Sequence, residues 1–324
     1  MSAPITLAIG PRALEAQLVA DIAADQRALR EDLSRLSAPL RVIVSSGALR
    51  AHVAATLVRE VGDSVLGVVV QTLWGAAREV LERAGLAPPV GGALFEVLAR
   101  RAAAEQPQLA RLLEPLDDGY GVVGETLRDF LSAGLTRAIA AELETITQRE
   151  IRSDVLRDRT LALVRAAARC ERSLRELGVG RSTDLLAVAA QRLRASGAQL
   201  LPARAVLVTG FSDATGQAVR LIDTLRATHG ARVYVHQPPQ DVLGGAGSAG
   251  QDQQRERLAT GRAGFLARFL GRLGGETTPA DARSTRARIA LFDASGADGE
   301  VREVAYRVRE LCDEGVAPER IGIT

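Results

Sequence analysis

The sequence predicts an α/β protein built on a parallel sheet, with an all-helical insertion and the start of a second α/β domain near the end. Three observations support this class. Short β-branched runs alternate with helical patterns, and this order implies right-handed crossovers between parallel strands. The middle of the chain shows no strand pattern. After a polar break at residues 274–287, a further strand–helix–strand pattern begins.

Seven short apolar runs have the composition of buried strands, because valine, isoleucine and leucine dominate them. They are residues 5–10, 41–46, 66–73, 205–211, 232–237, 288–294 and 320–324. Helical periodicity marks residues 48–61 and 215–230, and Gly230 is a natural C-terminal stop for the second helix.

Three regions follow from this pattern. Residues 87–200 are rich in alanine, leucine, arginine and glutamate, which predicts an all-helical insertion. Residues 1–86 and 201–280 on either side together form the first α/β domain. Residues 286–324 begin a second domain, and we expect the chain to be the N-terminal piece of a longer protein, since one strand–helix–strand unit cannot bury both faces of its sheet. The alternative is that this unit extends the first sheet.

Composition narrows the possible chemistry. No apolar run reaches membrane-spanning length and the N-terminus lacks a basic signal-peptide start, so we expect a soluble cytoplasmic protein with no membrane contact. The two cysteines, Cys170 and Cys312, and the three scattered histidines have no metal-ligand spacing, so no metal site is predicted. All 41 basic residues are arginine, which excludes lysine-dependent phosphate sites and Schiff bases.

The turn after the first strand lacks the features of a phosphate-binding loop. Such a loop has the pattern G-x-x-x-x-G-K-[ST], in which backbone amides wrap the phosphates and a lysine reaches them. This chain has Gly10, then Pro11, which carries no amide hydrogen, and then Arg12. No second glycine, lysine or hydroxyl residue follows in the required places.

The strand at 205–211 lacks the acids of an ATP-hydrolysing motor. One acid would hold magnesium and the other would polarise the attacking water, but Thr209 and Gly210 occupy these places. Asp213 follows the turn and cannot replace both acids; it either caps the next helix, the favoured interpretation, or binds a partner. Both halves of the nucleotide site are therefore degenerate. This interpretation expects the segments around Gly10 and Thr209 to be neighbouring strands of one sheet.

Six segments occur in the order of known helicase motifs. They are "RVIVSSGALRAHVAATLVRE", "VVVQTLWGAAREVLERAG", "DFLSAGL", "VLVTGFSDATGQAVRLIDTL", "RVYVHQPPQD" and "IALFDASGADGEVREVAYRVRELCDEGVAPERIGI". The chain resembles superfamily 1 helicases, and more closely the N-terminal part of the AddB-type subunit of bacterial helicase–nucleases. The resemblance implies a degenerate P-loop-helicase-like domain 1A over 1–86 and 201–280, a 1B-like insertion over 87–200, and a truncated second helicase-like domain from 286.

The resemblance also implies a function. In this family an AddA-type partner subunit hydrolyses ATP, and the AddB-type subunit guides DNA during double-strand-break repair and recombination. The PD-(D/E)XK nuclease centre lies far C-terminal, often beside an iron–sulfur cluster. Nuclease activity, magnesium and an iron–sulfur cluster are therefore implied only for a full-length parent, and no cofactor or catalytic residue is expected in this chain.

Candidate DNA contacts are the residues on turns that face DNA in active relatives. Arginines, hydroxyl groups and helix N-termini are expected to contact phosphates, and Trp74 either stacks on a base or fills the seam between sheet and insertion. The candidates are Ser45, Ser46, Arg50, Gln71, Thr72 and Trp74.

Two alternatives stay open at this point. The chain could be a protein–protein scaffold that does not touch DNA. It could also be a serine hydrolase, because "GFSDA" is a near match to the G-x-S-x-G nucleophile elbow, with Ser212 as nucleophile and His229 or His236 as base. The acids available to such a triad, Asp213 and Asp223, lie in the same turn or helix as Ser212, which is a poor geometry.

Overall fold

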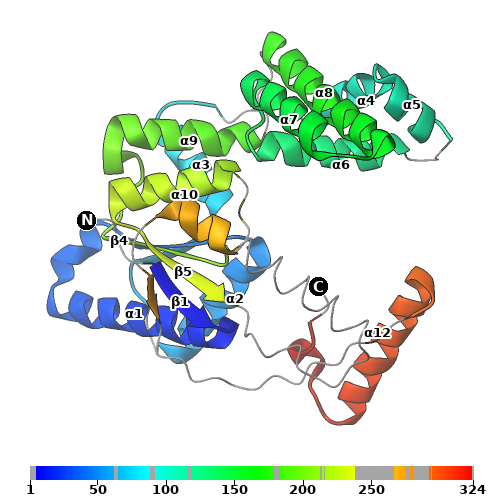
Figure 1. Ribbon diagram of the computed structural model, residues 1–324. Helices are drawn as coiled ribbons and strands as arrows, with labels where there is room; N and C mark the ends of the chain where they lie inside the picture. The colour runs from blue at the N-terminus through cyan, green and yellow to red at the C-terminus, as the bar shows by residue number, and fades with distance from the viewer. Residues whose placement is uncertain are drawn as a thin grey trace. The chain divides into compact units, whose positions relative to one another are not determined.

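The computed structural model describes residues 5–61, 65–87, 92–115, 119–178, 182–211, 214, 216–237, 266–274, 277–279, 292 and 294–322. The chain divides into two compact units, Met1–Ser284 and Thr285–Thr324, and each is described by itself (Figure 1). The first unit contains the sheet, its covering helices and the helical insertion.

The first unit is built on a parallel sheet, so the predicted α/β class is confirmed. Its order among the described residues is β3-β2-β4-β5-β1-β6, and every pair of neighbouring strands is parallel. The strands are β1 (Ile5–Ile9), β2 (Leu40–Val44), β3 (Val68–Thr72), β4 (Ala205–Thr209), β5 (Arg232–Gln237) and β6 (Thr277–Pro279). The sequence predicts the first five. It does not predict β6, which lies in the polar stretch at 274–287.

The expectation that the segments around Gly10 and Thr209 form neighbouring strands is wrong. Both β1 and β4 belong to the sheet, but β5 lies between them: Val233 of β5 pairs with Ile5 on one side and Val208 on the other. The short crossover after β4 brings the chain back beside that strand. Because Val233 and Val235 are fully buried, β5 can occupy an interior place.

Helices cover both faces of the sheet. On one face lie α1 (Pro11–Glu31) and α2 (Gly47–Glu60), which pack on side chains such as Val42 and Leu207. On the other face α3 (Leu73–Arg83), α9 (Ser182–Ser196), α10 (Gly216–His229) and the helical residues 266–273 pack on side chains such as Ile43. Figure 1 shows α3, α9 and α10 on one side of the sheet and α1 on the other. Alternating strand residues thus supply two separate cores.

The described residues between β3 and β4 form helices only, as the composition predicts. Five of these helices share a core of their own: α4 (Gly92–Ala104), α5 (Pro107–Leu113), α6 (Gly119–Ser132), α7 (Arg137–Glu150) and α8 (Asp154–Glu176). Helix α9 instead packs against α3 and α10, and its Leu186, Ala189 and Leu193 belong to the core beside the sheet. We call α4–α8 the helical insertion from here on.

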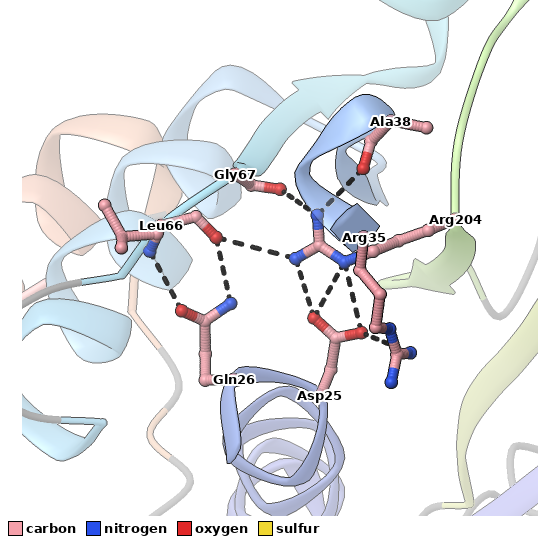
Figure 2. Close-up of polar contacts among 7 residues, drawn as sticks. All are labelled: Asp25, Gln26, Arg35, Ala38, Leu66, Gly67 and Arg204. Carbon is pink, nitrogen blue, oxygen red and sulfur yellow. Dashed lines mark hydrogen bonds and ion pairs between the residues drawn. The ribbon is translucent and has the colours of Figure 1, made fainter. Parts of the chain in front are cut away.

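A buried polar cluster, which we call the amino-end clasp, fastens α1 to the start of three strands (Figure 2). Arg204, just before β4, forms a bidentate ion pair with Asp25 of α1 and donates to the carbonyl oxygens of Ala38 and Gly67. Both charged side chains are only 7% exposed. Beside them, the side-chain amide of Gln26 donates to the carbonyl oxygen of Leu66 and accepts a hydrogen bond from its N–H. A neighbouring strand would satisfy the same two backbone groups. The cluster supplies hydrogen bonds to backbone groups at this edge, where the ladder of the sheet begins.

A second buried arginine ties β2 to α3. The Arg41 guanidinium donates to both carboxylate oxygens of Glu79, at 2.6 and 2.8 Å, and to the carbonyl oxygen of Pro202. Burial alone would raise the pKa of Glu79, but the hydrogen bonds and charges of Arg41 and then Arg83 hold it below its usual value. The carboxylate therefore stays ionised beside its arginines.

The second unit contains α12 (Gly296–Asp313) and a 3-10 turn (Pro318–Arg320). The strand predicted at 288–294 falls mostly outside the described residues, and Phe292 and Ala294 are not in a strand. The strand predicted at 320–324 is wrong for residues 320–322, because Pro318 starts a 3-10 turn that includes Arg320. Residues 323 and 324 lie outside the described part.

Candidate nucleic-acid interface

The carboxyl ends of the parallel strands bring the sequence-predicted residues to one edge of the sheet, which we call the carboxyl edge. This edge carries Gly10, Pro11 and Arg12 after β1, Ser45, Ser46 and Arg50 after β2, Gln71, Thr72 and Trp74 at the end of β3, and Thr209 and Gly210 at the end of β4. Asp213 lies outside the described residues. From β3 to β1 the edge spans four strand spacings, or roughly 19 Å.

The connection between β1 and α1 is a single residue. Strand β1 ends at Ile9, Gly10 has φ +85° as the N-cap of α1, and the helix begins at Pro11. A phosphate-binding loop needs several consecutive residues between strand and helix, with free amides along them. This turn has neither the length nor the donors to wrap a phosphate group. Arg12 is exposed in the first turn of α1.

The end of β4 is closed against the turn that follows β2. Thr209 is buried, with 6% exposure, and Gly210 has φ +83°. A Cβ atom on Gly210 would collide with Cδ2 of Leu49 and would lie 2.9 Å from Oγ of Ser45. A side chain at the position where a motor would carry its second acid would therefore have to displace the side chains of Leu49 and Ser45 and to adopt a positive φ.

The hydroxyl residues after β2 and β3 cap helices. Oγ of Ser46 accepts a hydrogen bond from the Leu49 amide, and Oγ1 of Thr72 accepts one from the Gly75 amide, each at 3.1 Å. These contacts stabilise the starts of α2 and α3. Each hydroxyl keeps its hydrogen for donation to another acceptor. Gln71, next to Thr72, has a buried Nε2 without a hydrogen-bond partner in the described part of the chain.

Trp74 is not fully buried between the sheet and the insertion. Its side chain is 40% exposed. Helix α3 buries a stripe at helical spacing instead, formed by Leu73, Ala76, Ala77 and Val80, and Trp74 lies off this stripe. A large exposed aromatic ring at the carboxyl edge is a surface on which a base can stack.

The described helix starts at the carboxyl edge favour negatively charged groups. The first turns of α1, α2 and α3 contain no acidic residue, so the partial positive charge of each helix N-terminus is not offset. Arg12 and Arg50 are exposed, and neither has a recorded ion pair with another described residue. The His52–Glu15 contact, at 2.9 Å, links α2 to α1 further along the helices. The absence of first-turn acids is a sequence signal for this edge, because it can be read once the helix starts are located.

His229, one of the two bases in the hydrolase alternative, lies far from the carboxyl edge. It ends α10, a helix of 14 residues that runs about 20 Å from the carboxyl edge. Its Nε2 contacts the Leu201 carbonyl oxygen at 3.0 Å and its Nδ1 contacts Oγ1 of Thr228 at 2.7 Å. Burial lowers the pKa of His229, which favours the neutral ring. Ser212 itself lies outside the described residues.

Other site types find little support in the described residues. No group of three or more histidine, cysteine or acidic side chains there is placed to hold a metal ion. No helix in the same part of the chain has the length and apolar character to cross a membrane. A comparison of the sequence with protein-family models and with curated proteins finds no match to either.

Proposed function

We propose that this chain is a non-motor, helicase-like part of a DNA-guiding subunit, which holds single-stranded DNA along the carboxyl edge. One observation carries the proposal: three helix N-termini without first-turn acids, two exposed arginines and an exposed tryptophan share this edge. Helix N-termini and arginines are the groups that bind phosphates, and aromatic rings stack on bases.

Two features of the same edge favour a holding role over ATP hydrolysis. The one-residue turn at Gly10 offers no phosphate cradle, and an acid at Gly210 would have to displace the side chains of Leu49 and Ser45. The proposal extends to a cytoplasmic complex in double-strand-break repair, with an AddA-type subunit supplying the ATP hydrolysis. Nuclease chemistry, with magnesium and an iron–sulfur cluster, belongs to it only for a longer parent chain.

The dimensions suit a short stretch of polynucleotide. An edge of roughly 19 Å is long enough to contact several successive phosphates of an extended single strand. Arg12 and Arg50 lie on helices that follow β1 and β2, so they can contact different phosphates of the same strand. Trp74, after β3, is then placed to stack on a base beyond them.

The phosphate contacts predict a specific salt dependence. Replacing Arg12 or Arg50 by glutamine should lower the slope of log K against log salt concentration by about 0.7 each, because one counterion fewer is released. Fluorescence anisotropy of labelled single-stranded DNA, measured from low to moderate salt, gives the slope. Arg30→Gln is the matched control, since Arg30 is exposed in the last turn of the same α1 and should leave the slope unchanged. Absence of binding at low salt would favour the scaffold alternative.

Trp74 provides a direct optical test, because it is the only tryptophan in the chain. Adding single-stranded DNA should quench its fluorescence if a base stacks on the exposed ring. Trp74→Ala should weaken binding by ~1–3 kcal/mol, or roughly 5–150-fold, while the unfolding temperature stays close to that of the wild type. Tyr306→Ala, which changes an exposed aromatic residue of α12, is the control. Unquenched fluorescence at saturating DNA would exclude stacking at this position.

A further inference from the structure

Two segments far apart in the sequence meet beside the carboxyl edge. The turn after α6 contains Ala133 and Gly134, and the first turn of α10 contains Gly216 and Gln217. A Cβ atom on Gly216 would collide with the Ala133 carbonyl oxygen, and one on Gly134 would lie 3.1 Å from Nε2 of Gln217. Both segments belong to motifs quoted in the sequence analysis, but nothing there indicates that they touch.

The contact joins the end of one helix to the start of another. Helix α6 ends in a Schellman motif: the Leu135 amide donates to the Phe130 carbonyl oxygen, the Gly134 amide donates to that of Leu131, and Gly134 has φ +91°. The negative end of α6 therefore meets the positive end of α10, which is a favourable arrangement of helix dipoles. Because α10 is the next helix after β4 and begins at Gly216, the joint lies on the side of the sheet where the carboxyl edge is.

Among the described residues, the closed joint leaves a buried polar atom without a hydrogen bond, which costs free energy. Gln217 is only 7% exposed, and its Oε1 is buried without a hydrogen-bond partner in the described part of the chain. A buried, unpaired acceptor favours any state in which water reaches it. The joint therefore combines a favourable helix–helix contact with a penalty that opening would remove, so the closed state is favoured by less than the contact alone would give.

We propose that Ala133–Gly134 and Gly216–Gln217 form a latch that holds the helical insertion against the carboxyl edge and opens when polynucleotide enters. Gly216 and Gln217 are positioning residues: they act through the insertion and not by contact with DNA. Only the DNA-binding arm of the test rests on the proposed function.

Two substitutions should move the latch in opposite directions. Gly216→Ala adds a methyl group where the Ala133 carbonyl lies and should open the latch, although alanine by itself favours a helix over glycine. Gln217→Met keeps the length of the side chain, removes the unpaired acceptor and should close it. Gly271→Ala, in a helical position with open space around it, and Gln191→Met, on an exposed face of α9, are the matched controls.

The latch is measured without DNA by the distance between two spin labels in the full chain. Cysteines replace Val122 of α6 and Arg220 of α10, both exposed, after Cys170→Ala and Cys312→Ser. We expect Gly216→Ala to broaden the distance distribution towards longer values, and Gln217→Met to narrow it. Distributions identical to those of the control variants in both cases would overturn the latch. If Gly216→Ala prevents folding, Gln217→Met alone decides the outcome.

Single-stranded DNA then tests the role of the latch. We expect Gln217→Met to slow the association of single-stranded DNA by roughly fivefold or more. This factor corresponds to the smallest free-energy penalty expected for a buried acceptor without a hydrogen bond. An unchanged association rate, with altered spin-label distances, would show a joint that has no part in DNA entry. Failure of every variant and of the wild type to bind DNA would instead contradict the proposed function and leave the distance result standing.

Discussion

Replacing Arg204 by methionine is expected to lower the free energy of unfolding by about 3–5 kcal/mol, because it leaves Asp25 as a buried charge without its main partner. The substitution also removes donors from the carbonyl oxygens of Ala38 and Gly67. Urea unfolding of the full chain measures the loss, with the transition of the first unit followed by circular dichroism.

Two further variants distinguish the stability that the amino-end clasp contributes from a general effect of losing an arginine. Arg35→Gln removes the more exposed partner of Asp25 and should cost less than about 1 kcal/mol. The double variant Arg204→Met/Asp25→Leu removes both buried charges and should recover part of the loss. A cost for Arg204→Met no larger than that for Arg35→Gln would contradict the role of the amino-end clasp.

Replacing Gly210 by alanine is expected to cost about 2–5 kcal/mol of stability. Part of this cost is the backbone strain of a side chain at φ +83°, and part is the collision of its Cβ with Leu49 and its close approach to Ser45. Thermal unfolding measured by calorimetry gives the change. The result bears on function, because it measures the cost of a side chain at the position where a motor would carry its second acid.

Gly10→Ala is the matched control for this second prediction. Gly10 also follows a strand, precedes a helix and has positive φ, but a Cβ atom there would meet nothing within 4 Å. Its replacement should therefore carry the cost of backbone strain alone, about 1–3 kcal/mol. Equal losses for Gly10→Ala and Gly210→Ala would mean that the turn after β2 does not close the end of β4.

The sequence predicts the strands that carry their own hydrophobic signal and misses the one that does not. Strands β1 to β5 are apolar runs, whereas β6 is Thr277–Pro279, a short edge segment that pairs with β1 through its backbone. The order of the strands across the sheet is also not encoded in local sequence patterns. The position of β5 between β1 and β4 depends on pairing between distant segments, which no residue spacing encodes.

The residues of the carboxyl edge were predictable because strand ends can be located from sequence, and parallel strands end at one edge. The exposure of Trp74 could also have been predicted, since Leu73, Ala76, Ala77 and Val80 already complete the buried stripe of α3. The amino-end clasp could not. Asp25 and Arg204 are 179 residues apart, and charged side chains in this chain are common and mostly exposed.

The most direct test of the central claim is one anisotropy titration of labelled single-stranded DNA with the full chain at low salt, with and without excess magnesium–ATP. If the carboxyl edge holds DNA and no longer binds nucleotide, binding will weaken steeply as salt is added and will be unaffected by ATP. Absence of binding, or an affinity that changes with ATP while ATP is hydrolysed, would contradict it.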